Sequence, residues 1–203
     1  MNTNADEQEL KDRLSLIETM IAEGRRTTES WGWTFVLWGL AYYVAIAWSA
    51  WGRSTLAWPV TMIAAGILTG IFGSRIKSGR PETTVGRSML AIWLGMGIST
   101  FIIMLSLGFS GRMDLHIAIA IIGAMLGAAN ATSSIILKWK MQFACALVWW
   151  ATGAVSCFIS DSQAGILFLI AIFFCQIVFG FYGMIAESRK RKAGRNGQEV
   201  SHA

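Results

Sequence analysis

Hydrophobic residues along this chain gather in six long stretches that contain no charged side chain. The stretches cover residues 31–52, 54–74, 88–111, 115–137, 141–160 and 162–186. At about 1.5 Å rise per residue, a helix over any of them is long enough to cross a hydrocarbon core of about 30 Å. The pattern predicts an all-α membrane protein, with six transmembrane helices arranged as three hairpins.

Tryptophans mark both ends of the first stretch. Trp31 and Trp33 lie at one end, and Trp48 and Trp51 lie at the other. Indole rings favour the membrane–water interface, so this spacing is typical of a bilayer span. Composition agrees, because 14% of the 203 residues are charged, against roughly 25% in soluble domains. We expect one membrane domain over residues 31–186.

The positive residues indicate how the spans are oriented. Of the 17 Lys and Arg residues, only Arg53 and Arg112 lie on one side of the predicted spans, and the other 15 lie on the opposite side. The positive-inside rule then places both termini in the cytoplasm. Residues 187–203 form a basic cytoplasmic tail. The net charge of +5 is explained in this way, and we expect no nucleic-acid partner.

Residues 1–30 form a separate cytoplasmic segment, in which residues 5–26 have a helical pattern. Leu10, Leu14, Ile17 and Ile21 recur at spacings of four, three and four and share one face. Such an amphipathic helix either lies against the membrane or the protein's own cytoplasmic loops, or pairs with another helix through a two-heptad seam. Two heptads are fewer than the three or four that identify a coiled coil.

Small residues recur on the second, fourth and sixth predicted spans. Lipid provides no hydrophobic force between helices, so close backbone approach at glycines drives their association. The spacing predicts packing inside the chain, or alternatively a homo-oligomer face, with these three helices near the centre. The glycines are Gly66, Gly70, Gly123, Gly127, Gly180 and Gly183.

A weak internal repeat accompanies the hairpin pattern. Trp38, Trp93 and Trp149 recur at separations of 55 and 56 residues, on the first helix of each predicted hairpin. Simple regularity of hairpin length explains the same spacing.

Four polar residues within the spans are candidates for interhelical contacts or for a polar route through the bundle. They are Asn130, Ser133 and Ser134 in the fourth span and Gln176 in the sixth. No Asp, Glu, Lys or Arg lies deep in a span. This disfavours an ion-coupled carrier, which usually needs an intramembrane ionisable group.

Catalytic and metal-binding patterns are missing from the sequence. It contains no HExxH, GxSxG or P-loop motif. Asp114 and His116 are too few for a metal site, and Asp114 is instead placed to cap a helix. The cysteines show no CxxC spacing: Cys145, Cys157 and Cys175. We expect no catalytic, cofactor or metal site, and no enzyme.

A charged helix from Leu10 to Arg26 precedes a Trp/Gly-rich first span, with Ser30-Trp31-Gly32-Trp33 and Trp38-Gly39. Over roughly the first 50 residues, this layout resembles that of small uncharacterised bacterial inner-membrane proteins. The resemblance implies a bacterial, integral membrane protein and carries over no functional residues.

Two hypotheses about function follow. The first is a non-enzymatic membrane component whose cytoplasmic elements contact a protein partner or a second copy, forming a homo-oligomer. These elements are the helix at residues 5–26, the loop at 76–87 and the tail at 187–203. The alternative is a small passive transporter or channel for a small solute. In both, the lipid bilayer surrounds the six-helix domain.

Overall fold

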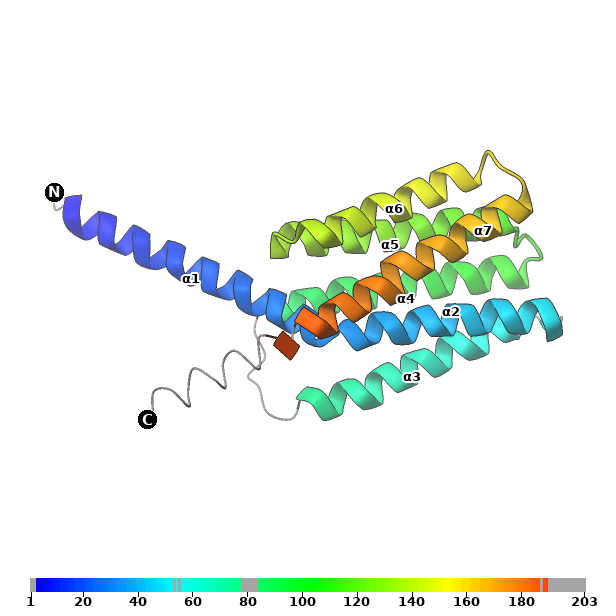
Figure 1. Ribbon diagram of the computed structural model, residues 1–203, viewed down its shortest axis with the longest axis horizontal. Coiled ribbons are helices and arrows are strands. Elements are labelled where there is room, and N and C mark those ends of the chain that lie inside the picture. The colour runs from blue at the N-terminus through cyan, green and yellow to red at the C-terminus, as the bar shows by residue number, and fades with distance from the viewer. Residues whose placement is uncertain (1–2, 53, 55, 78–83, 187, 190–203) are drawn as a thin grey trace.

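The structure is a computed structural model that describes residues 3–52, 54, 56–77, 84–186 and 188–189 (Figure 1). Over these residues the chain is helical and contains no strand, which confirms the all-α class. The helices are α1 (Thr3–Ser30), α2 (Gly32–Gly52), α3 (Ala57–Lys77), α4 (Thr84–Phe109), α5 (Leu115–Leu137), α6 (Lys140–Ser156) and α7 (Asp161–Ile172), which continues into a π-helical segment, η1 (Phe173–Val178).

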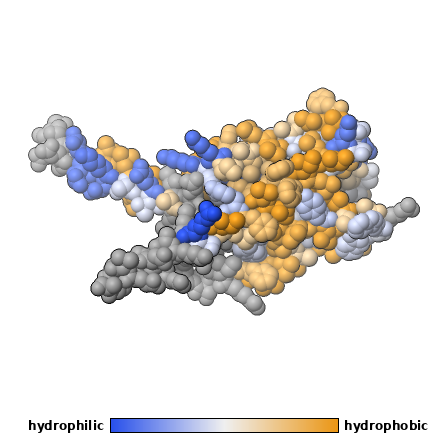
Figure 2. All heavy atoms as spheres, viewed as in Figure 1, coloured by the Kyte–Doolittle hydropathy of each residue, from blue (hydrophilic) through white to orange (hydrophobic). Residues whose placement is uncertain are grey.

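Five helical segments of the described chain are long and apolar enough to cross a membrane. They are Gly32–Gly52, Ala57–Ser74, Thr84–Phe109, Leu115–Leu137 and Asp161–Ala186. Figure 2 shows the corresponding apolar surface over the bundle, with hydrophilic residues towards its ends. These features confirm a membrane-embedded, multi-pass protein.

The fifth predicted span is shorter than expected. The sequence predicts this span over residues 141–160, but α6 has 17 residues and ends at Ser156. The next residues form a turn, because Ser160 begins the following helix: its backbone N–H donates to Gln163 Oε1 at 3.2 Å. This capping interaction takes Ser160 out of α6. At 17 residues, α6 lies at the lower limit for a transmembrane helix, which is about 17 residues.

Helix α1 is longer than the predicted 5–26 and extends away from the bundle (Figure 1). Its side chains from residue 7 to residue 20 are all exposed. It runs outward in roughly the direction of the bundle helices rather than across their ends. Helix α1 contacts α4 and α5 of the bundle, and the loop at 78–83 lies outside the described residues, so whether the helix lies against the membrane or the protein's own loops, or pairs with another helix, stays a prediction. Only Trp31 separates α1 from α2, so the two helices follow each other almost directly.

Helices α5 and α6 form the most extensive helix–helix contact in the described structure. The Asp114 carboxylate accepts from His116 N at 2.9 Å, which confirms the predicted cap of α5. At the other end, Lys138 adopts a left-handed conformation with φ 49°. Trp139 N then donates to Ser134 O at 2.9 Å, which closes a tight turn into α6.

Helix α2 crosses the last helix close to its C-terminal part. A β-carbon on Gly32 would lie 2.7 Å from Gly180 O, and one on Gly180 would lie 2.8 Å from Gly32 O. The hydroxyl of Tyr43 adds a hydrogen bond to Leu169 O at 2.9 Å. By contrast, α3 packs mainly against α2 and lies at the edge of the bundle (Figure 1).

Two of the three repeated tryptophans make a hydrogen bond to the other helix of the same hairpin. Trp38 Nε1 donates to Thr69 Oγ1, and Trp93 Nε1 donates to Ser133 Oγ, both at 3.1 Å. Trp149 Nε1 is buried and has no hydrogen-bond partner. The third hairpin therefore lacks the tryptophan hydrogen bond that joins the helices of the first two, and Trp149 is fixed by packing alone.

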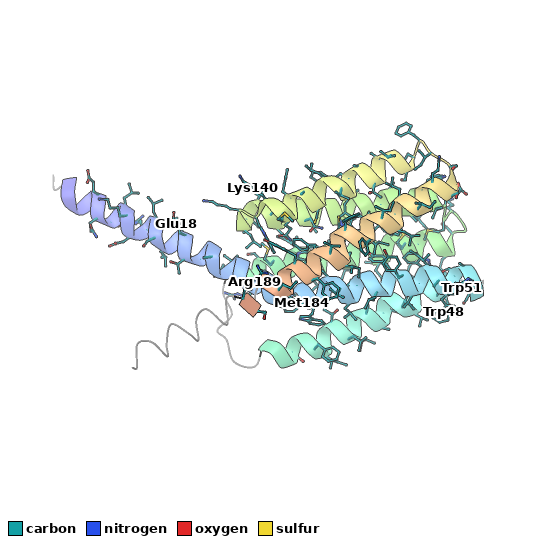
Figure 3. The ribbon with its side chains drawn as sticks, in the orientation of Figure 1. Glu18, Trp48, Trp51, Lys140, Met184 and Arg189 are labelled. Atoms are coloured by element: carbon teal, nitrogen blue, oxygen red, sulfur yellow. The ribbon has the colours of Figure 1, made fainter. Side chains whose placement is uncertain are left out.

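The two ends of the bundle differ in chemistry. Lys140 and Arg189 lie at the end from which α1 leaves, and Trp48 and Trp51 lie at the opposite end (Figure 3). The basic residues predicted for the loop at 78–83 and the tail at 190–203 lie outside the described residues, as does Arg53.

Candidate functional site

The polar residues predicted on α5 are all buried in the bundle. Asn130 is 1% exposed, and its Nδ2 donates to Leu126 O of the preceding turn at 2.8 Å. The Ser134 hydroxyl likewise donates to Ala131 O at 2.7 Å. Ser133 instead accepts from Trp93 of α4, so it alone of these three makes a hydrogen bond to another helix. Ser133 is therefore an interhelical contact.

Gln176 lies in η1, where the helix widens from α to π geometry. It is 3% exposed, and its Oε1 has no hydrogen-bond partner. A β-carbon on Gly39 would lie 2.9 Å from the Gln176 β-carbon, so the Gln176 side chain begins in contact with α2. Single π turns inside α-helices are rare and occur often at functional sites. Sequence reasoning identified Gln176 but missed the π turn that carries it.

No hydrogen bond joins any two of Asn130, Ser133, Ser134 and Gln176 within the described structure. The Gln176 side chain packs against α2, whereas the Ser133 hydroxyl makes a hydrogen bond with Trp93 of α4. A polar route through these four residues therefore stays a prediction.

Sequence reasoning missed Gln142, which is the most deeply buried amide of the chain's described part. It is fully buried, and neither Nε2 nor Oε1 has a hydrogen-bond partner. Gln142 lies in the first turn of α6, close to the end of the predicted span, where a polar side chain can reach the membrane–water interface. The spacing could have indicated its burial, because Gln142 precedes Cys145 by three residues and Trp149 by seven and so shares their buried face of α6.

Replacing Gln142 by leucine is expected to stabilise the protein by about 1 kcal/mol. A buried amide without partners costs about 1–3 kcal/mol, and leucine has a similar volume without that cost. Denaturant unfolding in detergent micelles measures the change. Ser133→Ala is the matched control and should destabilise, because it removes the acceptor of Trp93. A loss of stability in Gln142→Leu would show that the amide has a partner, such as a buried water molecule.

The predicted glycines divide into two groups. On α5, a β-carbon on Gly123 would lie 2.7 Å from Trp149 O and 2.9 Å from Gly153 Cα, and one on Gly127 would overlap the Trp150 ring. Gly180 faces Gly32, as described above, and Gly183 is buried. Gly123, Gly127 and Gly180 pack helices together, and the sequence analysis did not predict their partners on α2 and α6.

Gly66 and Gly70 do not pack within the described chain. Both are exposed, and a β-carbon on either would meet no atom within 4 Å. The prediction that they bring α3 into the centre of the bundle is wrong. Its physical reason is that α3 contacts α2 through its other face, where Thr61 and Ala65 are buried.

His116, at the start of α5, contacts the end of α6 and the start of α7 at the end of the bundle opposite α1. Its Nδ1 lies 2.7 Å from Ser156 O at the end of α6, and its Nε2 lies 2.8 Å from Asp161 Oδ1 at the start of α7. The sequence did not indicate these two partners, which are 40 and 45 residues away. Within the described residues, no three His, Cys, Asp or Glu side chains come together as a metal site.

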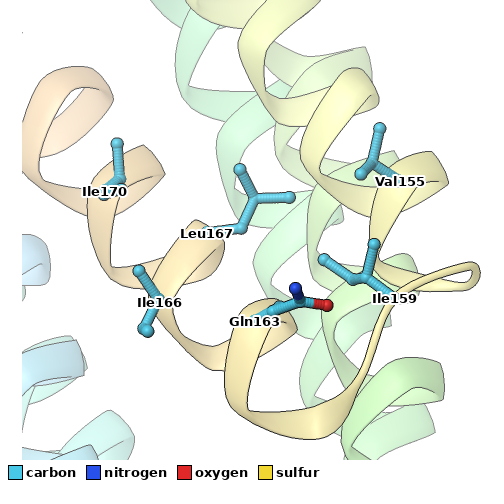
Figure 4. Close-up of a pocket in the computed structure, with 6 residues that line it drawn as sticks. All are labelled: Val155, Ile159, Gln163, Ile166, Leu167 and Ile170. Carbon is cyan, nitrogen blue, oxygen red and sulfur yellow. The ribbon is translucent and has the colours of Figure 1, made fainter.

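A shallow groove lies between α6 and α7 near the same end (Figure 4). Its lining is apolar except for Gln163, whose Oε1 already accepts from the Ser160 hydroxyl at 3.1 Å. The groove therefore presents mainly a hydrocarbon surface. It is lined by Val155, Ile159, Gln163, Ile166, Leu167 and Ile170.

The exposed face of α1 is the feature least explained by packing within the chain. Leu10 is 59% exposed, Leu14 53% and Ile17 51%. These three side chains, which we call the α1 stripe, share one side of a helix that projects beyond the bundle (Figure 1). The side chain of Ile21, predicted to extend the stripe, lies outside the described side chains.

No protein-family model, curated protein or solved structure matches this chain.

Proposed function

We propose that this chain is a non-enzymatic component of a bacterial inner membrane that acts through protein contacts made by α1 in the cytoplasm. The observation that carries the proposal is the α1 stripe. A helix outside the bilayer gains stability when such side chains leave water, at about 25 cal/mol per Å² of buried apolar surface. The described chain supplies nothing to cover them, so we infer a protein partner.

The proposed orientation has six spans, including α6, with both termini in the cytoplasm. It is supported by Lys140 and Arg189, which lie at the same end of the bundle as α1 (Figure 3). Under the positive-inside rule this end faces the cytoplasm. The interfacial rings of Trp48 and Trp51 then lie at the outer leaflet.

A lipid-bound α1 is a weaker explanation of the stripe. Helices that lie on membranes run along the surface and carry Lys and Arg on their polar face. Here α1 runs outward from the bundle, and its charged residues include the acidic Asp12 and Glu18 as well as basic ones. Anionic lipid would repel these carboxylates, whereas a protein partner can pair with them.

The test compares cross-linked complexes in native membranes. The triple variant Leu10→Ser, Leu14→Ser, Ile17→Ser removes the α1 stripe and is expected to abolish the complex seen with the full chain. Leu16→Ser is the matched control: Leu16 is 61% exposed but lies off the stripe, so the complex should persist. A complex that survives the triple variant at full yield would overturn the proposal.

A further inference from the structure

We infer that the partner of the α1 stripe is a second copy of this chain, bound as a parallel two-stranded coiled coil. The inference rests on the proposed function and names its partner. It makes the protein a homodimer in which α1 of one copy buries the stripe of the other.

The stripe has the spacing of a coiled-coil seam. Leu10, Leu14 and Ile17 are separated by four and three residues, as d, a and d positions of a heptad repeat are. Each has about half or more of its side chain exposed. A second identical helix presents an equal stripe, so Leu10, Leu14 and Ile17 of the two copies can cover one another.

The charges beside the stripe select the second copy and the parallel direction. In this register Arg13 occupies a g position and Glu18 the following e position. In a parallel pair, a g residue lies beside the e residue five positions later on the partner helix. Arg13 of one copy thus meets Glu18 of the other, and the two-fold axis repeats the contact. Both pairs are attractive.

The membrane favours the same arrangement. Two copies inserted in one bilayer with the same orientation project α1 from the same side, so their helices are parallel. A seam this short is marginal between free helices in water. Anchoring both helices to bundles in one membrane raises their effective concentration and lowers the entropic cost of pairing.

Arg13 remains available for the partner despite its contact within the chain. It pairs with Glu9 one turn earlier, and the two side chains are 72% and 62% exposed. Exposed pairs four residues apart on a helix contribute little and exchange readily. Glu9 occupies a c position outside the seam, so it provides a control for loss of this intrahelical pair.

Disulfide cross-linking of the full-length chain in isolated membranes tests the seam. Cys145, Cys157 and Cys175 are first replaced by alanine, and Leu14→Cys or Asp12→Cys is added. Leu14 lies in the seam, whereas Asp12 lies on the opposite side of α1 in this register. On oxidation, Leu14→Cys should give a disulfide-linked dimer of two chains, and Asp12→Cys should give little. Equal yields from both positions would overturn the inference.

Charge reversal then tests the direction and the partner. In the Leu14→Cys background, Arg13→Glu alone or Glu18→Arg alone places like charges at both contacts, and we expect each to lower dimer yield about tenfold. Co-expression of the two variants restores both attractive pairs and should restore a mixed dimer. The double variant should recover as well, and Glu9→Gln should leave the yield unchanged.

The outcomes separate this inference from the proposed function. If the mixed variants do not recover, or no dimer forms while the triple variant still abolishes a complex, α1 binds a different protein and only the inference fails. If the complex is indifferent to the triple variant, the proposed function fails too.

Discussion

Replacing Gly123 by leucine is expected to separate α5 from α6 and to destabilise the protein by about 3 kcal/mol or more. A β-carbon at this position would lie 2.7 Å from Trp149 O and 2.9 Å from Gly153 Cα. Both atoms belong to the backbone of α6, so no rotamer change relieves the contact. The free energy of unfolding in detergent micelles, measured with denaturant, reports the loss.

Gly66→Leu is the matched control for this prediction. Gly66 is also a helical glycine, but nothing lies within 4 Å of its β-carbon position. Its replacement should leave stability unchanged or raise it slightly, because leucine favours helix over glycine by roughly 0.5–1 kcal/mol. An equal loss in the two variants would show that Gly123 does not act through close packing of α5 and α6.

Replacing Trp149 by alanine is expected to cost about 3 kcal/mol. Trp149 is fully buried and packs against Phe168, with ring centroids 6.0 Å apart. Truncating a buried tryptophan leaves a cavity and typically costs about 3–5 kcal/mol. We expect the lower part of that range, because side chains of a membrane protein leave lipid rather than water when they pack.

Trp51→Ala provides the comparison, since Trp51 is 87% exposed and fills no space in the bundle. It should have little effect on unfolding of the purified protein. Trp149→Phe should fall between the two: Trp149 Nε1 has no hydrogen-bond partner, so only ring volume is lost. If Trp149→Ala left the free energy of unfolding unchanged, Trp149 would not fill space between α6 and α7.

The positions of the apolar helices were largely predictable, and their ends were less so. Residues 115–137 were predicted as a helix and form α5 with those bounds, because Asp114 caps one end and Lys138 leaves the helix at the other. The end of α6 was misplaced, since hydropathy does not register the capping of the next helix by Ser160 and Gln163. Helix α1 extends beyond its predicted ends because helical hydrogen bonding continues through polar residues.

The amino-acid sequence by itself determined that this protein is an all-helical, multi-pass membrane protein, because charge-free stretches of this length satisfy their backbone only as helices in lipid. Only the tertiary structure decided which small and polar residues meet. Gly66–Gly70 and Gly123–Gly127 have the same spacing, yet one pair faces outward and the other lies against α6. Gln142, at the start of the predicted span 141–160, is fully buried without a hydrogen-bond partner. Local spacing specifies which residues share a helix face, whereas the neighbour of that face depends on how distant helices pack.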